Sequence, residues 1–316
     1  MTTWGLSATI KAPAAEILRF VAYHLGQGAH RLYIYLDDDN PTAFAACKAH
    51  PKIRVTHCDD AHWRTLNNGR RPVKHQVRQT FNATHAYNRP AEVDWLIHID
   101  VDEFLVPERP ISKILATQPA EALCARVRPM EALATDTGFP TYFKAFIPNG
   151  KDRLRTVRTL YPTFGDSIKG GFLSHLAGKV FVRTGLNNVR VQIHNAFQND
   201  VEIPTAERTE EIGLAHFHTR NWDQWIGSFH YRLDRGSYRA ELGGNRSTDQ
   251  GKLTIHQMFQ VIFQDSGEAG LRAFFDEVCA DTPALRSRLE QHGLLRQADL
   301  DLDATISRFF PEYTDS

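Results

Sequence analysis

The sequence predicts an α/β fold with a mainly parallel central sheet flanked by helices, followed by a C-terminal helical appendage. Over roughly the first hundred residues, short runs of β-branched and aromatic residues alternate with segments of helical periodicity. From Trp222 onward the apolar residues recur mainly at helical spacing. Strands that alternate with helices in this way imply a parallel sheet with right-handed crossovers.

Four strands are predicted in the first hundred residues, at 4–10, 31–36, 53–57 and 93–99. Pro13 suits the first turn of a helix, and from Ile17 to His24 the stripe residues recur at i, i+3, i+4 and i+7. A short helix that ends near His50 and a longer one within 70–88 fill the other two connections.

The remaining chain divides into a loop-rich middle and a helical end. Strands are predicted at 123–127, 179–183 and 189–194, separated by segments rich in glycine and proline. Helices are predicted at 222–233, 254–264, 268–279 and 283–292. Trp222 and Trp225 are neighbours on a helix face, and we interpret them as core residues. We expect one domain at 1–235 and a helical region at 236–316 that packs on it.

The bulk composition excludes several partners. The chain has 316 residues, and its 37 Lys and Arg balance its 37 Asp and Glu, so no nucleic-acid partner is expected. The basic stretch 70–78 is interpreted as a solvated or diphosphate-facing helix. The four cysteines form no Cys-x-x-Cys pair, which predicts reduced thiols and a cytoplasmic protein. No apolar run is long enough to span a membrane, although a peripheral association stays open.

Asp100 and Asp102 are the most informative residues. They follow the apolar run 95–99, which predicts a buried strand. Because side chains alternate along a strand, we expect both carboxylates on one side, where they repel each other unless a cation lies between them. The carboxyl edge of a parallel sheet is also where ligands bind. The pattern predicts Mg²⁺ or Mn²⁺ and a phosphate-bearing substrate, with a simple turn as the alternative.

Other motifs accompany the acidic pair. Residues 94–105 read Asp-Trp-Leu-Ile-His-Ile-Asp-Val-Asp-Glu-Phe-Leu, and upstream lie Lys11, Glu16, Tyr23-His24 and a strand that ends at Asp37. Gln76, Tyr87-Asn88 and the segment 216–222 complete the series. Over roughly residues 4–236 the chain resembles a family 2-type glycosyltransferase of the GT-A fold, in the group with an Asp-x-Asp-Glu-Phe motif. It departs from that family at Ala12-Pro13, where Asn-Glu is usual.

The resemblance implies a metal-dependent, hexosyltransferase-like enzyme that acts with inversion. A sugar would move from a nucleotide-sugar, with a UDP-sugar favoured, to a hydroxyl of a carbohydrate or other acceptor. Mn²⁺ or Mg²⁺ would neutralise the departing diphosphate. The implied metal ligands are Asp100, Asp102 and His216, with His218 as the alternative to His216. The implied donor-binding residues are Lys11, Asp37, Gln76, Asp100 and Arg220.

Two further expectations concern carboxylates. Glu103 would point to the opposite face if the strand continued, and would brace a loop by an ion pair. A general base must take the proton of the acceptor hydroxyl, and the candidates are Asp136, Asp166 and Glu131.

Two other functions are weighed against this one. A nucleotidyltransferase of related α/β architecture usually has a glycine-rich loop after its first strand, and residues 11–15 contain no glycine. A non-catalytic carbohydrate-binding relative would not need the intact acidic pair and the late histidine.

Overall fold

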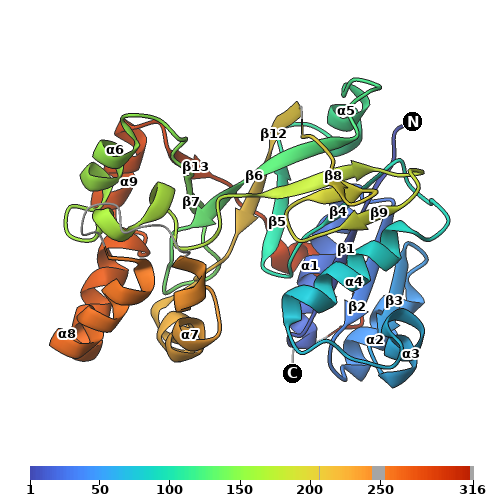
Figure 1. Cartoon of the computed structure of the whole chain (residues 1–316), viewed down its shortest axis with the longest axis horizontal. Coiled ribbons are helices and arrows are strands. Elements are labelled where there is room, and N and C mark those ends of the chain that lie inside the picture. The colour runs from blue at the N-terminus through green and yellow to red at the C-terminus, as the bar shows by residue number, and fades with distance from the viewer. Residues whose placement is uncertain (206, 244–252, 314–316) are drawn as a thin grey trace. The chain divides into compact units, whose positions relative to one another are not determined.

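The computed structural model describes residues 1–205, 207–243 and 253–313. The chain forms two compact units, each assembled from separate stretches (Figure 1). The first unit comprises Met1–Arg128, Ala177–Leu214 and Leu300–Ser316, and the second comprises Pro129–Leu176 and Ala215–Asp299. The expected boundary at residue 235 divides the chain into two consecutive segments, whereas each of these units combines separate segments. That boundary stays a prediction.

The central sheet of the first unit is mainly parallel. Its strand order is β3 (Ile53–His57), β2 (Arg31–Leu36), β1 (Trp4–Ile10), β4 (Trp95–His98), β8 (Lys179–Arg183) and the start of β6 (Cys124–Ala132). β1, β2, β3 and β4 are parallel neighbours. β8 is antiparallel to both β4 and β6, so β6 runs in the same direction as β4. The predicted fold class is thus confirmed.

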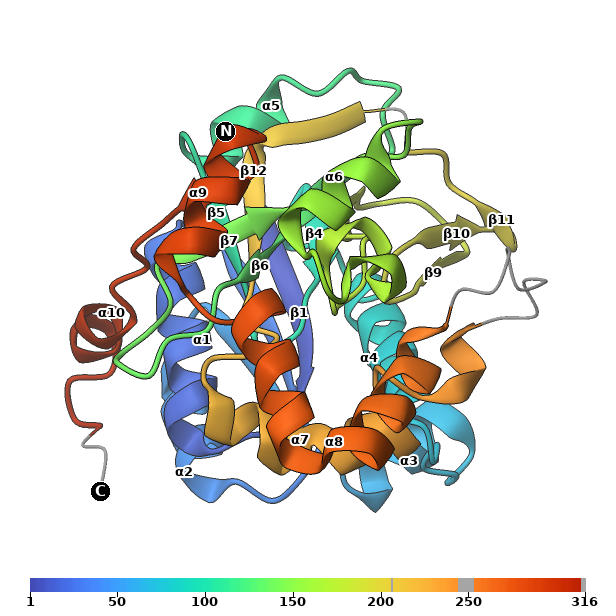
Figure 2. The same ribbon diagram turned by 90° about the vertical axis from the view of Figure 1, so that its left-hand side faces the viewer.

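Helices cover both faces of this sheet, with α1 (Ala14–Gly26) on one side and α4 (His75–Tyr87) on the other (Figure 2). All seven residues of β1 are buried, as expected for a parallel strand between two helical layers. Two further helices, α2 (Pro41–Ala49) and α3 (Asp60–Asn67), complete the crossovers. Trp63 of α3 and Tyr87 of α4 share an apolar cluster with Leu96 of β4.

The rest of the first unit comes from distant segments. β5 (Glu103–Pro107) pairs with β12 (Glu207–His216), and α5 (Ile111–Ala116) follows β5. β9 (Val189–Val191), β10 (Ala196–Gln198) and β11 (Val201–Glu202) form a small sheet. The helix α10 (Leu302–Phe309) packs on α1, where Arg19 contacts Asp303 at 2.9 Å.

The second unit is built mainly of helices around an aromatic core. The end of β6 pairs with β7 (Tyr142–Ala145), which pairs with β13 (Leu295–Gln297). The α-helices are α6 (Arg153–Leu160), α7 (Trp222–Asp234), α8 (Ile255–Val278) and α9 (Pro283–Gln291). Short 3₁₀ turns lie at Gly165–Ser167, Lys169–Gly171 and Ala240–Gly243.

α8 confirms the prediction of two successive helices in this part of the chain. Gly267 interrupts it with φ 55° and ψ −141°, a backbone conformation that residues with a side chain rarely adopt. The glycine lies between the two predicted segments, 254–264 and 268–279. α8 has 24 residues, yet no helix in the described ranges is both long and apolar enough to cross a membrane.

Trp225 is the centre of the aromatic core, as its predicted core role requires. Its side chain is fully buried. Its ring centroid lies 5.4 Å from that of Phe229, 5.9 Å from Phe259, 6.0 Å from Phe274 and 5.7 Å from Phe275.

We therefore expect Trp225→Ala to lower the free energy of unfolding by about 3–5 kcal/mol, because it opens a large cavity among these rings. Trp222→Ala, which removes a partly exposed ring, is the matched control and should cost less. Urea denaturation of both variants tests this, and equal losses would contradict the central role of Trp225.

Candidate functional site

The acidic residues lie in a turn, not on a continuing strand. β4 ends at His98 and β5 begins at Glu103. The turn is closed by the Glu103 N–H, which donates to the Asp100 carbonyl at 3.0 Å. In return, the Asp100 N–H donates to Oε2 of Glu103 at 2.9 Å. Because β4 ends at His98, the condition under which Glu103 would point to the opposite face is not met.

Lys179 of β8 holds this turn together. Its side chain is fully buried, and its Nζ lies 2.7 Å from Oδ2 of Asp100 and 3.2 Å from Oε2 of Glu103. Glu103 is also fully buried, whereas the Asp100 side chain is 27% exposed. Glu103 thus braces the turn by an ion pair, as the sequence predicts, and its partner is Lys179.

The electrostatics of the turn follow from this lysine. Burial alone would lower the pKa of Lys179, but the two carboxylates raise it above its ordinary value. Burial would raise the pKa of Asp100, and the Lys179 ammonium reverses the direction. Burial and Lys179 lower the pKa of the nearby His98 to about 4, so its imidazole is neutral at pH 7.

α4 presents an unusual polar stripe to the interior of the first unit. The stripe residues, at i, i+3, i+4 and i+7, are His75, Arg78, Gln79 and Asn82. The Gln79 amide donates to Oδ1 of Asp100. The Asn82 amide donates to the Thr9 hydroxyl of β1 at 3.0 Å. One face of α4 therefore forms hydrogen bonds with polar groups in or after two parallel strands, Thr9 in β1 and Asp100 after β4.

The same helix reaches the predicted donor residue Asp37, which follows β2. Oδ2 of Asp37 accepts from Nε of Arg78 at 2.8 Å, and Oδ1 accepts from Arg71 at 2.8 Å. Nδ1 of His75 lies 3.5 Å from Oδ2. Burial would raise the pKa of Asp37, but the hydrogen bonds from these three side chains hold it at about 2.

The other predicted donor residues are less enclosed. Lys11 follows β1 and is exposed, and Gln76 lies exposed in the first turn of α4. Arg220 belongs to the second unit, where its guanidinium lies 5.7 Å from the Phe139 ring centroid. Asp102 is partly buried in the turn after β4. The binding roles of these residues stay predictions.

The two candidate histidines differ in their surroundings within the second unit. Nε2 of His218 accepts from the Tyr238 hydroxyl at 2.9 Å and from Arg232 at 3.1 Å. Burial and the Arg232 charge lower the pKa of His218 well below its ordinary value. This nitrogen of His218 is therefore occupied, and the choice between the two histidines as a metal ligand stays a prediction. His216 is buried, with its ring centroid 5.5 Å from that of His218.

Glu131, a candidate base, is held in a second buried ion pair. Its Oε1 lies 3.1 Å from Nζ of Lys144, and both side chains are at most 4% exposed. The backbone N–H groups of Leu173 and Ser174 donate to the same carboxylate at 3.2 and 2.7 Å. Burial would raise the pKa of Glu131, but Lys144, His218 and the hydrogen bonds from Ser174 hold it at about 2. So acidic a carboxyl is a weak base.

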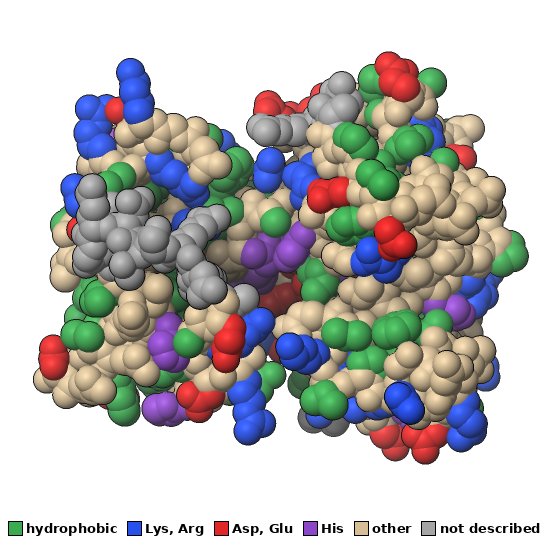
Figure 3. All heavy atoms as spheres, in the orientation of Figure 1, with side chains coloured by type: hydrophobic (Ala, Val, Ile, Leu, Met, Phe, Trp, Pro, Cys, Tyr) green, Lys and Arg blue, Asp and Glu red, His purple; other side chains and the backbone are tan. Residues whose placement is uncertain are grey.

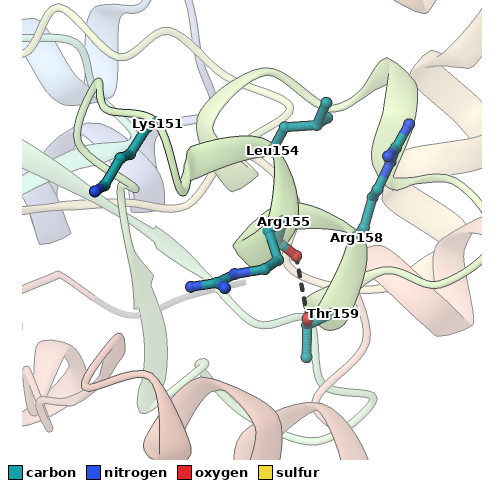
Figure 4. A pocket seen from close by; sticks show the side chains of 5 residues that line it. All are labelled: Lys151, Leu154, Arg155, Arg158 and Thr159. Atoms are coloured by element: carbon teal, nitrogen blue, oxygen red, sulfur yellow. Dashed lines mark hydrogen bonds between the residues drawn. The ribbon is translucent and has the colours of Figure 1, made fainter.

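The other two base candidates are exposed acids of the second unit. Asp136 follows β6, and Asp166 pairs with Arg158 at 2.6 Å. Arg158 also lines a hollow of about 420 Å³ with Lys151, Arg155 and two other α6 residues (Figure 4). Basic side chains gather over this helix (Figure 3). Because Arg155 also has an acidic partner, Asp152 at 3.0 Å, we interpret this surface as a solvated helix face.

Sequence reasoning missed Lys179, Gln79 and Lys144. The two lysines carried a signal, because each begins or interrupts a short apolar strand, Lys-Val-Phe-Val in β8 and Tyr-Phe-Lys-Ala in β7. A lysine in such a run is almost never buried without a partner. Gln79 carried no signal apart from its place on the α4 stripe.

The acidic turn fits a divalent cation by charge and by donor type. Asp100, Asp102 and Glu103 against Lys179 leave a formal charge of −2 on these four side chains. Carboxylate oxygens are the ligands that Mg²⁺ and Mn²⁺ prefer. Asp100 already accepts from Lys179 and Gln79, and the ligand roles of Asp100 and Asp102 stay predictions.

The acidic turn lies at the carboxyl end of β4 in a mainly parallel α/β sheet, the edge at which open α/β sheets bind ligands. The chain belongs to glycosyltransferase family 92, whose family model matches residues 8–241, or 234 of 316 residues. The match confirms that the chain is a glycosyltransferase, as the sequence predicted, and it assigns the chain to family 92 where family 2 was expected. The comparison with curated proteins gave no match.

Solved structures show only distant similarity. The galactosyltransferase LgtC, solved with donor and acceptor sugar analogs, has 10% identity and a TM-score of 0.29, with 57% of each chain covered. HddC from Yersinia pseudotuberculosis has 12% identity and a TM-score of 0.29, covering 58% of this chain and 75% of its own. An active-site mutant of LgtC has 12% identity and a TM-score of 0.27, again with 57% of each chain covered. The family assignment therefore rests on the family model alone.

Removing the buried cation tests its role in the first unit. We expect Lys179→Met to lower the free energy of unfolding by about 3–5 kcal/mol, because it leaves Asp100 and Glu103 facing each other without the ammonium. Adding Glu103→Gln should recover part of that loss. Lys113→Met, at an exposed position on α5, is the matched control. Urea denaturation measures all four proteins, and a loss no larger than that of the control would refute the proposed support.

The low pKa of Glu131 has a measurable consequence for stability. Because its pKa of about 2 lies below the ordinary 4.5, ionised Glu131 stabilises the native state above pH 4.5, and this contribution is lost as the pH falls toward 2. Glu131→Gln removes that contribution. Its unfolding free energy should therefore fall less steeply with acid, by up to about 1.4 kcal/mol per pH unit.

Chemical denaturation at several pH values below about 5 measures this slope. Glu290→Gln, which alters an exposed acid on α9, is the control and should leave the slope almost unchanged. A Glu131→Gln slope equal to that of the parent protein would show that the carboxyl titrates normally.

Proposed function

We propose that this chain transfers a sugar from a nucleotide-sugar, with a UDP-sugar as the favoured donor, to a hydroxyl of a carbohydrate or other acceptor. The acceptor oxygen would bond to the anomeric carbon while the sugar–phosphate bond breaks, with inversion, and the nucleoside diphosphate would leave. The observation that carries this proposal is the acidic turn at the carboxyl end of β4, held by Lys179, in a chain of family 92.

We propose that transfer depends on Mn²⁺ or Mg²⁺, with Asp102 as the direct protein ligand of the first unit. A bound divalent ion would neutralise the negative charge that builds on the departing diphosphate. Asp100, fixed by Lys179 and Gln79, would orient the donor instead of moving toward the ion. His216 belongs to the second unit, and its role as a further ligand is part of this proposal.

Other predicted residues take defined roles in the proposal. Lys11, Gln76 and Arg220 would bind the donor as hydrogen-bond or charge partners of its phosphates and sugar. Asp136 would be the general base, because Glu131 is held by Lys144 and Asp166 by Arg158. The proton of the acceptor hydroxyl would pass to the Asp136 carboxylate as the new bond forms.

Calorimetric titration of UDP and GDP, with Mn²⁺ and with EDTA, tests the metal-dependent donor site. We expect binding of one nucleotide in Mn²⁺ only, weakened at least about 100-fold in Asp102→Ala, because the ion loses its direct ligand. Asp265→Ala, an exposed acid on α8, is the control. Equal binding with EDTA would refute metal dependence, and no nucleotide binding under any condition would refute the donor class.

A further inference from the structure

The carboxylate of Asp37 is closed to any ligand. Its side chain has no exposed surface. One oxygen accepts from Arg71 and the other from Arg78, each at 2.8 Å. A nucleotide that approached this end of β2 would meet the groups around Asp37 instead of Asp37 itself.

Arg71 is fixed in place and yet accessible. Its NH2 group donates to the Asp37 carbonyl at 2.9 Å as well as to Oδ1 at 2.8 Å, and its side chain is 46% exposed. Two guanidinium groups on one carboxylate leave an excess charge of +1 at this point. A guanidinium that is already oriented loses little further entropy when it binds an oxygen of a ligand.

Asp38 supplies the complementary acceptor. The Asp37 carbonyl, which accepts from Arg71, and the backbone nitrogen of Asp38 belong to the same peptide group. Oδ1 of Asp38 is buried and has no hydrogen-bond partner among the described residues. The alternative role for this acid, as a cap for α2, belongs to Asn40, which accepts from the Ala43 N–H at 3.0 Å. A buried carboxylate oxygen without a donor is costly unless a ligand provides one.

Both groups lie where the parallel strand β2 ends, at the edge at which open α/β sheets bind ligands. We propose that Asp38 and Arg71 contact the nucleoside part of the donor, and that Asp37 is a positioning residue that holds Arg71. Asp38 accepts from a hydroxyl or N–H of the nucleoside, and Arg71 donates to a carbonyl or phosphate oxygen. This inference rests on the proposed function, and it assigns the contact between an aspartate and the nucleoside to Asp38 instead of Asp37.

Calorimetric titration with UDP, GDP and inorganic diphosphate, each with Mn²⁺, tests the contact. We expect Asp38→Ala to weaken binding of the preferred nucleoside diphosphate by about 10- to 100-fold, the effect of a lost hydrogen bond to a charged group. Binding of inorganic diphosphate should not change, because it has no nucleoside. Asp39→Asn, at the exposed next position, is the matched control and should bind like the parent protein.

Asp37→Asn and Arg71→Ala, singly and together, test the positioning role. We expect both single variants to weaken nucleoside diphosphate binding to a similar extent, and the double variant to be no weaker than Arg71→Ala. Additive losses would show that Asp37 acts apart from Arg71 and would overturn its role. Arg71→Lys, which keeps the charge but not the fork, should recover only part of the affinity.

The outcomes separate this inference from the proposed function. If the parent protein binds a nucleoside diphosphate and Asp38→Ala binds it equally well, the assignment of Asp38 is wrong while the donor class stands. If the parent protein binds no nucleoside diphosphate, both fail together. A loss of inorganic diphosphate binding in Asp38→Ala, equal to the loss for UDP or GDP, would also overturn the nucleoside contact.

Discussion

The ammonium of Lys179 is the charge on which the acidic turn of the first unit depends. It lies between a fully buried glutamate and an aspartate that is 27% exposed, and without it these carboxylates would repel each other in a medium that screens charge poorly. The topology supplies this cation. β8, the antiparallel neighbour of β4, brings a lysine to a turn that lies 79 residues earlier in the sequence.

In both units, a buried carboxylate is stabilised by positively charged side chains. In the first, Asp37 is enclosed by two arginines, and in the second, Glu131 is enclosed by Lys144 and two backbone N–H groups. Buried pairs of this kind add little net stability over apolar packing, but they are costly to break. They fix the geometry of a loop or turn more sharply than apolar contacts do, because each hydrogen bond has a direction.

The sequence predicted the elements of the fold better than the surroundings of the candidate residues. Continuous apolar runs gave the first strands of the sheet, and the spacing of apolar residues gave the helices of the second unit from Trp222 onward, including the break at Gly267. The helix α6 was not predicted, because it lies in a segment rich in glycine and proline. The alternation of side chains along a strand did not predict the direction of the Asp100 side chain, because β4 ends at His98 and a turn follows. The partners of Asp37 and Glu103 were out of reach, since an ion pair between distant segments depends on how the strands are ordered and leaves no local pattern.

The order of the segments in the first unit has a consequence for how the protein is made. α1 leaves the ribosome long before its neighbour α10, because Arg19 and Asp303 are 284 positions apart in the sequence. All of the second unit is encoded between them. During synthesis the surface of α1 that α10 covers must therefore stay exposed, or be protected by another protein, until α10 emerges.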